Sequence, residues 1–219
     1  MIRAFDFIVV LIAIIFLSPL FLILCLILKF SGEGEIFYLQ ERVGRNNKKF
    51  KVYKFATMLK NSEFIGAGTL TLKNDPRVLR IGKYLRITKL NELPQLFNIL
   101  FGEMSLVGPR PLVPEGENLY SEELSHSIRS IRPGVTGIGS LVLRDEESYY
   151  AHRENAHEFY RDVISPYKGS LELWYVKNQS FSLNIKIIFL TFFAIFFPSF
   201  DPIKYFAGLP KMPEKMKST

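Results

Sequence analysis

Apolar residues form a continuous run near the start of the chain. Residues Phe7 to Leu28 contain no charged side chain, and Ser18-Pro19 lies near the middle of the run. A helix of this length would span about 33 Å, enough to cross a bilayer. Proline removes a backbone donor and clashes with the preceding turn, which predicts a kink at Ser18-Pro19. Arg3 and Lys29 flank the run, so charge does not orient it. Two alternatives remain: a kinked transmembrane helix, or a re-entrant helix whose ends emerge on one face of the membrane.

A second apolar stretch lies near the C-terminus. Ile185 to Phe200 is rich in Phe, Ile and Leu but contains Lys186 and Pro198. It is short for a membrane span, which favours a helix lying in the membrane interface, with a buried core helix as the alternative. The segment from Pro210 onward is polar and rich in lysine, which predicts disorder.

The pattern between these segments predicts an α+β fold dominated by helix. Ile36–Gln40 and Phe50–Phe55 alternate as short strands do, and Gly44-Arg45-Asn46-Asn47 would turn the hairpin between them. A loop is expected at 61–74 and a turn at 132–137. Helices are predicted at Pro76–Ile87, Pro94–Phe101, Pro114–Ser127, Glu146–Val163 and Pro166–Lys177. We therefore expect a membrane segment over residues 1–30, one domain over 31–205 that includes the helix at 185–200, and a polar tail over 206–219.

The charge balance narrows the classes of partner. The chain has 28 Lys and Arg against 21 Asp and Glu, a net charge of +7. This balance suits phosphorylated substrates or anionic lipid. It would also suit nucleic acid, but no zinc-finger spacing, RNP motif or helix-turn-helix is present, so no nucleic acid partner is expected. The single cysteine, Cys25, excludes a disulfide framework and a cysteine metal site within one chain.

Four basic residues stand beside strand ends, helices or turns: Lys54, Arg86, Arg110 and Arg132. Arginine matches the oxygens of a diphosphate in bidentate fashion. Arg110 is held between two prolines, which lowers the entropy it loses on binding. Thr136 and the backbone amides of the turn after Arg132 could cradle a phosphate. The alternative for each basic residue is a surface charge or a contact with lipid headgroups.

Asn91 and Glu92 are the candidates for catalysis. Glu92 is expected in the first turn of a helix, where the dipole favours an anion, and it could act as acid or base or bind Mg²⁺ through phosphate. The Asn91 amide cannot act as a carboxylate nucleophile. The alternative is structural, because Asn is a good N-cap for the helix that Gly102 would end. The three histidines, at 126, 152 and 157, have no ligand partners in the pattern and are expected on the surface.

Together these residues resemble the bacterial sugar transferase family, the monotopic phosphoglycosyl transferases, over nearly the whole chain. The motifs that carry the resemblance are the Ser18-Pro19 break, Arg42-Val43-Gly44, Tyr53-Lys54-Phe55, Asn74-Asp75-Pro76-Arg77, Glu92-Leu93-Pro94-Gln95, Met104-Ser105, Gly108-Pro109-Arg110-Pro111, Arg132-Pro133-Gly134-Val135-Thr136-Gly137 and the segment from Tyr175 to Asn178.

The resemblance implies a membrane enzyme of bacterial glycoconjugate and polysaccharide assembly. Such a protein is monotopic, with a re-entrant helix broken at Ser-Pro and interfacial C-terminal helices, at the cytoplasmic face of the inner membrane. It would transfer a sugar-1-phosphate from a UDP-sugar to polyprenyl phosphate, with Mg²⁺, and release UMP. Glu92 would help to bind Mg²⁺ or position phosphate. The residues implied in substrate binding are Lys54, Arg86, Arg110, Arg132 and Arg144.

The chain departs from the family pattern at the dyad, where an Asp-Glu pair forms a covalent phosphosugar intermediate and this sequence has Asn91-Glu92. Ala56, residues 138–141 and Glu172 depart as well. Three hypotheses remain. The first is transfer without an aspartyl intermediate, in which either Glu92 or the lipid phosphate itself attacks the donor. The second is a glycosyltransferase that acts on a polyprenyl-diphosphate-linked sugar with Glu92 as base, and the third is a non-catalytic membrane scaffold. An introduced Asp-to-Asn change would also explain Asn91. The oligomeric state stays open, with a homo-oligomer among the alternatives.

Overall fold

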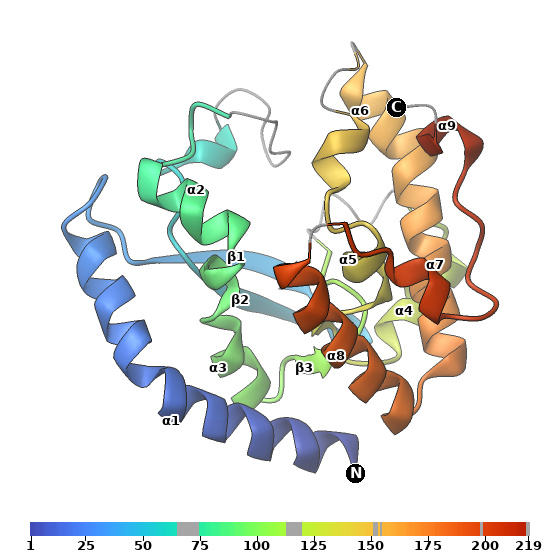
Figure 1. Cartoon of the computed structure of the whole chain (residues 1–219), viewed down its shortest axis with the longest axis horizontal. Coiled ribbons are helices and arrows are strands. Elements are labelled where there is room, and N and C mark those ends of the chain that lie inside the picture. The colour runs from blue at the N-terminus through green and yellow to red at the C-terminus, as the bar shows by residue number, and fades with distance from the viewer. Residues whose placement is uncertain (65–74, 113–119, 151–152, 154, 198, 218–219) are drawn as a thin grey trace. The chain divides into compact units, whose positions relative to one another are not determined.

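The chain forms two compact units (Figure 1). The computed structural model describes residues 1–64, 75–112, 120–150, 153, 155–197 and 199–217. Unit 1 comprises Met1–Gln40 and Lys51–Gly102, and unit 2 comprises Glu41–Phe50 and Glu103–Thr219. In the described residues helices dominate, and the strands form two small sheets, β1-β2 and β3-β4. The helix-dominated α+β class predicted from the sequence is therefore confirmed.

Helix α1 (Ile2–Lys29) opens unit 1, with Pro19 inside it. The predicted break at Ser18-Pro19 is wrong in one respect: the helix bends along its length (Figure 1) but continues through the proline. Pro19 has no N–H to donate to the carbonyl of Ile15, one turn earlier. The Ser18 hydroxyl donates to that oxygen instead, at 2.8 Å. The Ser18 hydroxyl thus satisfies the carbonyl to which Pro19 cannot donate.

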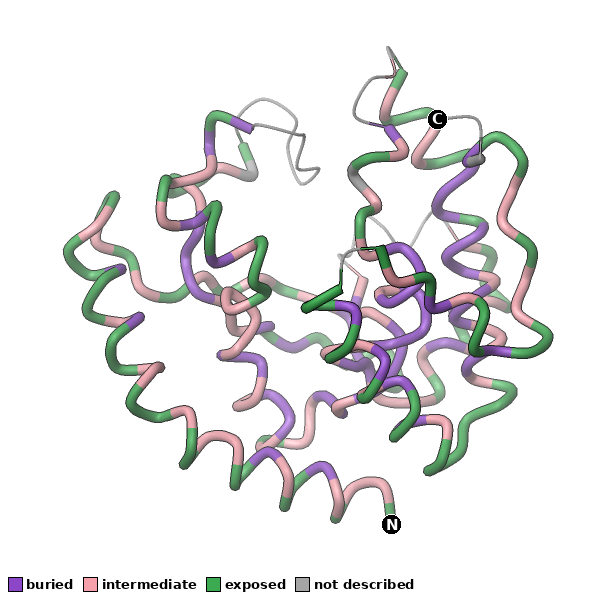
Figure 2. The backbone as a smooth tube through the Cα atoms, in the orientation of Figure 1, coloured by how far each residue is buried: buried purple, intermediate pink, exposed green. Residues whose placement is uncertain are grey.

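The C-terminal half of α1 is part of the core of unit 1. Leu24 and Leu28 are buried together with Phe55 and Leu85. The Phe21 ring lies 4.9 Å from the Phe55 ring, measured between centroids. Most of α1 nevertheless stays exposed or half-exposed (Figure 2), and only 11% of its most apolar window is buried. The helix is long and apolar enough to cross a membrane by length and composition.

Strands β1 (Phe37–Val43) and β2 (Lys49–Phe55) form the predicted hairpin. Asn46 and Asn47 take positive φ angles of 56° and 60° in its turn, a conformation that Asn tolerates better than most residues. The division between the units falls within this hairpin.

Helices α2 and α3 follow in the described part of unit 1. Helix α2 (Arg80–Ile87) starts later than predicted, because Pro76 to Leu79 run along the segment after β2, with Met58 and Val78 in an antiparallel bridge. Helix α3 (Gln95–Leu100) ends as predicted at Gly102, whose φ of 84° suits glycine. The sequence suggested that Asn91 caps α3, but the structure shows that it does not. It lies inside a short 3₁₀ helix, η3 (Leu90–Glu92), and Pro94 is the residue before α3.

Unit 2 is built on a parallel pair of three-residue strands, β3 (Ser105–Val107) and β4 (Gly134–Thr136). The predicted turn at 132–137 is therefore wrong in part, because its second half pairs as a strand. Helix α4 (Glu122–Arg129) begins where the Ser121 hydroxyl accepts from the Leu124 N–H. Residues 114–119 of the helix predicted over Pro114–Ser127 lie outside the described residues, as do residues 65–74 of the predicted loop.

The predicted helix over Glu146–Val163 is wrong in its first part, while residues 156–163 are helical. This region contains a 3₁₀ helix (Glu146–Tyr149), helix α6 (Ala156–Phe159) and a π-helical turn (Tyr160–Ile164), and Asn155 before α6 has non-helical angles. Helix α7 (Ser165–Asn178) confirms the next prediction, and helix α5 (Ile138–Val142) was not predicted. Tyr175 on α7 is fully buried, and its hydroxyl contacts Asn184 and the Val107 carbonyl.

Helix α8 (Phe181–Phe196) includes most of the predicted interfacial segment but begins earlier, because the Ser180 hydroxyl caps it by accepting from the Leu183 N–H. Its inner side is buried in unit 2, and its outer side exposes the rings of Phe189, Phe192 and Phe196. The predicted disorder of the tail is wrong up to residue 217. The tail contains helix α9 (Glu214–Lys217), in which the side chain of Met216 is buried, at 2% exposed.

Candidate active site

The predicted site residues divide between the two units. Unit 1 contains Lys54, Arg86, Asn91 and Glu92, and unit 2 contains Arg110, Arg132, Thr136 and Arg144. Each group is therefore described within its own unit.

The Asn91–Glu92 pair stands on the core of unit 1. The chain enters η3 through Lys89, which takes a left-handed φ of 59°. Leu90 and Leu93, on either side of the pair, pack against the cluster of Leu24, Leu28, Phe55 and Leu85. Two leucines anchored in the same core therefore fix the backbone of Asn91 and Glu92, and α1 supplies part of that support.

The side chain of Asn91 carries an unexplained polar atom. Its Oδ1 is buried and has no hydrogen-bond partner among the described residues. Leaving a buried acceptor unsatisfied costs about 1–3 kcal/mol, so such an atom in a native protein needs an explanation, which can be strain, a catalytic role, or a bound water or ion. An amide oxygen in this position can accept a hydrogen bond or coordinate a cation.

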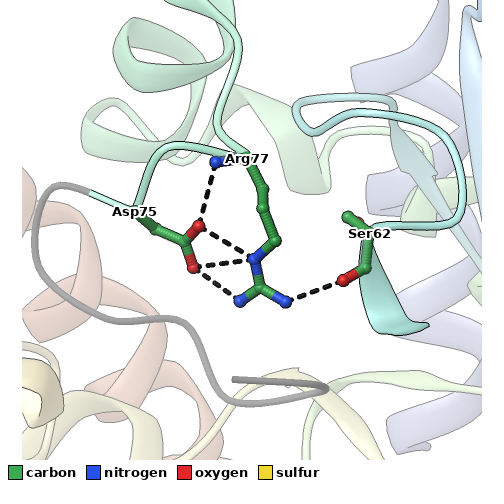
Figure 3. Close-up of polar contacts among 3 residues, drawn as sticks. All are labelled: Ser62, Asp75 and Arg77. Carbon is green, nitrogen blue, oxygen red and sulfur yellow. Dashed lines mark hydrogen bonds and ion pairs between the residues drawn. The ribbon is translucent and has the colours of Figure 1, made fainter. Parts of the chain in front are cut away.

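Lys54 and Arg86 lie on different elements of unit 1. Lys54 is the last residue but one of β2, and Arg86 lies in the last turn of α2. A buried ion pair holds the approach to α2 (Figure 3): the Arg77 guanidinium bonds to both oxygens of Asp75, at 2.5 to 3.1 Å, and to the Ser62 carbonyl at 2.7 Å. The Asp75-Pro76-Arg77 motif thus fixes where α2 begins, and with it the course of the helix that carries Arg86.

In unit 2 the two glycine-rich motifs meet along β3 and β4. Gly134 N donates to Pro109 O at 2.9 Å, and Gly108 N donates to Thr136 O at 3.0 Å. A Cβ on Gly108 would lie 2.4 Å from the Arg132 carbonyl oxygen, so only glycine allows this approach. The pairing brings the segments that carry Arg110, Arg132 and Thr136 together in unit 2.

Arg110 rests on a buried carboxyl that the sequence analysis did not assign to the site. Its backbone N–H donates to Glu172 Oε1 at 3.4 Å, and Glu172 is 2% exposed. The second oxygen, Oε2, is buried without a hydrogen-bond partner among the described residues. Burial raises the pKa of Glu172 to about 7. The signal in the sequence was an acidic residue inside an otherwise apolar stretch of α7.

Thr136 and Arg144 both contact α8. The hydroxyls of Thr136 and Thr191 are 2.8 Å apart. Arg144 Nη1 donates to the Ala194 carbonyl at 2.7 Å and to the Phe197 carbonyl at 3.4 Å, where the end of α8 lacks intrahelical donors. These contacts do not test the substrate-binding roles, which stay predictions for Thr136 and Arg144.

The sequence model of the bacterial sugar transferase family matches residues 1–198. The chain belongs to this family. The exopolysaccharide production protein ExoY of Sinorhizobium fredii is 37% identical to this sugar transferase over 88% of the chain and 84% of the relative. The undecaprenyl-phosphate glucose phosphotransferase of Komagataeibacter xylinus is 37% identical, over 86% of the chain and 34% of the relative. The UDP-glucose:undecaprenyl-phosphate glucose-1-phosphate transferase of Klebsiella pneumoniae is 36% identical, over 89% of the chain and 40% of the relative. Membership of this family makes the chain a transferase enzyme. The chain spans only about a third to two fifths of the length of the last two relatives.

The oxygens of the dyad fit a divalent cation only as a partial ligand set. Within the part of the chain that the structure describes, no group of three or more His, Cys, Asp or Glu side chains could hold a metal. His126 and His157 are exposed, as predicted, and His152 lies outside the described residues. Mg²⁺ commonly binds through one or two protein carboxylates and the phosphates of a substrate. Glu92 is a carboxylate of the kind that this mode of binding uses, and Asn91 offers an amide oxygen next to it in the sequence.

Proposed function

We propose that this sugar transferase moves a sugar-1-phosphate from a UDP-sugar to polyprenyl phosphate in one displacement, without an aspartyl intermediate. The observation that carries the proposal is Asn91. An amide stands beside Glu92, and its buried oxygen lacks a partner among the described residues. Relatives of this chain are named for transfer of a sugar phosphate to undecaprenyl phosphate, which supports the substrate classes.

A carboxylate nucleophile is not required by the chemistry of this transfer. The acceptor phosphate is already an anion, so one of its oxygens can attack the β-phosphorus of the donor directly. The new P–O bond joins acceptor and β-phosphorus, while the P–O bond to UMP breaks and UMP leaves with the electron pair. No proton moves. An amide at residue 91 also adds no negative charge beside the phosphates, which favours the approach of the acceptor.

Each of the four proposed site residues of unit 1 has a role in this scheme. Lys54 and Arg86 bind donor phosphates and offset the negative charge that repels the acceptor. Glu92 and Asn91 Oδ1 would hold Mg²⁺, which would supply charge neutralisation on the diphosphate. Substrate contacts of Arg110, Arg132, Thr136 and Arg144 are proposed on the sequence motifs and on the paired segments of unit 2.

The same proposal places the enzyme on a membrane. The acceptor is a lipid, α1 is long and apolar enough to enter a bilayer, and α8 exposes aromatic rings on its outer side. We infer a monotopic arrangement at the cytoplasmic face of the bacterial inner membrane, with α1 re-entrant and α8 in the interface. Its product would feed glycoconjugate or exopolysaccharide assembly, as the names of the ExoY relatives suggest.

Two-substrate kinetics tests the proposal. Purified enzyme, Mg²⁺ and UDP-glucose, UDP-galactose or UDP-N-acetylgalactosamine are combined with undecaprenyl phosphate, and UMP is measured. Direct transfer requires both substrates together, so double-reciprocal lines should intersect, and β-³²P-labelled donor alone should leave no label on the protein. Parallel lines or labelled protein would contradict it. UDP released only with a polyprenyl-diphosphate-linked sugar would indicate the glycosyltransferase instead, and no product with any pair would favour a scaffold.

The dyad itself gives a sharper test through Asn91→Asp. If transfer is direct, the added carboxylate has no bond to form, and the rate should not rise appreciably. Glu92→Gln serves as the control and should lower kcat by about 100-fold or more, since it removes the proposed metal ligand. A gain of several orders of magnitude in Asn91→Asp would show that the scaffold is built for the covalent route.

A further inference from the structure

Asn98 lies inside α3 with no exposed surface, and its side-chain amide faces the backbone of β2. Nδ2 donates to the Lys51 carbonyl at 2.7 Å, and Oδ1 accepts from the Tyr53 N–H at 3.0 Å. The carbonyl of one residue and the N–H two residues later point to the same side of a strand. The amide therefore pairs with β2 as a short piece of neighbouring strand would.

This contact joins two elements that carry proposed site residues. Tyr53 directly precedes Lys54 on β2. Asn98 belongs to the helical run that starts at η3, because Leu93 and Pro94 between η3 and α3 also have helical angles. Glu92 and Asn98 thus lie on one stiff segment, about 9 Å apart along its axis. The Tyr53 ring also contacts the Phe101 ring just after α3, at 6.5 Å between centroids.

We propose that Asn98 is a positioning residue that fixes Lys54 relative to the Asn91–Glu92 pair. It does not touch the substrate. Its two hydrogen bonds prevent α3 from sliding along β2, a motion that would move Glu92 past Lys54. The inference rests on the proposed function, which assigns these residues to the donor diphosphate. A displacement of about 1 Å between groups that bind one transition state can cost about 100-fold in rate.

Three variants separate positioning from stability. Asn98→Leu keeps the size and removes both hydrogen bonds. Asn98→Asp keeps the acceptor for Tyr53 but turns a second oxygen toward the Lys51 carbonyl. Ile99→Ala is the matched control, because Ile99 is its neighbour on α3 and is equally buried, at 0% exposed, but its side chain offers no polar atom to β2. Melting temperature, kcat and the donor KM are measured for each in the full-length membrane protein.

The expected result is a loss of kcat that stability does not explain. Asn98→Leu should lose about 100-fold and Asn98→Asp about tenfold in kcat, with smaller changes in donor KM. Ile99→Ala should lower the melting temperature but keep kcat within about threefold of wild type. The inference is overturned if Asn98→Leu also stays within about threefold, or if Ile99→Ala loses kcat as severely at a matched melting temperature.

Failure of the proposed function would be visible separately. In that case the wild type forms no UMP from UDP-sugar and undecaprenyl phosphate, and the Asn98 inference is then tested by calorimetry with Mg²⁺ and UDP. Weaker binding in Asn98→Leu but not in Ile99→Ala would support positioning of a phosphate-binding lysine. Equal binding by all variants would overturn it.

Discussion

Burial of the Glu172 carboxyl couples one residue to the pH dependence of the whole protein. Burial is the main cause that raises its pKa from 4.5 to about 7, while the Arg110 N–H and the charges of Lys168 and Arg110 act in the opposite direction. Lys168 itself pairs with Glu146 at 2.8 Å. Between pH 4.5 and about 7 the folded protein therefore holds a proton that the unfolded chain releases.

Replacement of Glu172 by Gln should remove this contribution. The raised pKa gives stability that is fully present below about pH 4.5 and is lost as the pH rises to about 7. Gln is neutral throughout, so the unfolding free energy of Glu172→Gln minus that of wild type should increase by about 3 kcal/mol from pH 4.5 to pH 8. Denaturant unfolding at a series of pH values measures the difference. A constant difference across this range would contradict the assignment.

Residues of this kind explain what a sequence alone does not reveal. Glu172 and Asn98 are polar residues in apolar stretches, and the groups that contact them lie far away in the chain, at Arg110 and on β2. Lys54, Arg86 and Glu92 were proposed from the chemistry of their side chains alone. Local sequence gives the type of a side chain, but long-range partners decide its environment.

At the scale of elements, local signals predicted local structure. The β1-β2 hairpin and α7 were predicted well, because alternation and helical periodicity operate within each segment. Strands β3 and β4 were missed because each has three residues and depends on a partner remote in sequence. The long helix predicted at 146–163 failed at Asn155, whose non-helical angles separate the 3₁₀ helix at 146–149 from the helical run that begins at Ala156.

The Ser18-Pro19 pair of α1 gives a prediction at this scale. Ser18→Ala leaves the Ile15 carbonyl without the donor at 2.8 Å and should destabilise the protein by about 1 kcal/mol or more. In a Pro19→Ala background, residue 19 gains an N–H that can bond to the Ile15 carbonyl, so the same Ser18→Ala change should cost little. Unfolding of the four proteins in lipid nanodiscs gives the coupling energy. Additive effects would show that the serine does not act through the proline.

At the scale of the whole molecule, the composition suggested a domain with a membrane appendage, but the structure assigns α1 to a folding unit. Leu24 and Leu28 are buried in the cluster that also supports Leu90 and Leu93 beside the dyad. At its other end, Arg3 donates to the carbonyls of Ile99 and Leu100, at 2.5 and 3.0 Å, and so caps the end of α3. A helix that only anchored the protein would need neither contact.

Deletion of residues 2–29 should therefore unfold unit 1 rather than release a soluble enzyme. It would expose Phe55 and Leu85 and leave the C-terminal carbonyls of α3 without Arg3. Unit 2 has its own core around Leu171 and Tyr175, so it should remain folded. Hydrogen exchange read by mass spectrometry should show lost protection over residues 80–100 and retained protection over α7. Full-length protein in detergent is the control. Wild-type protection of α2 and α3 in the deleted protein would show that α1 only anchors the protein. The support that we assign to the Asn91–Glu92 pair would then have to come from the remainder of unit 1.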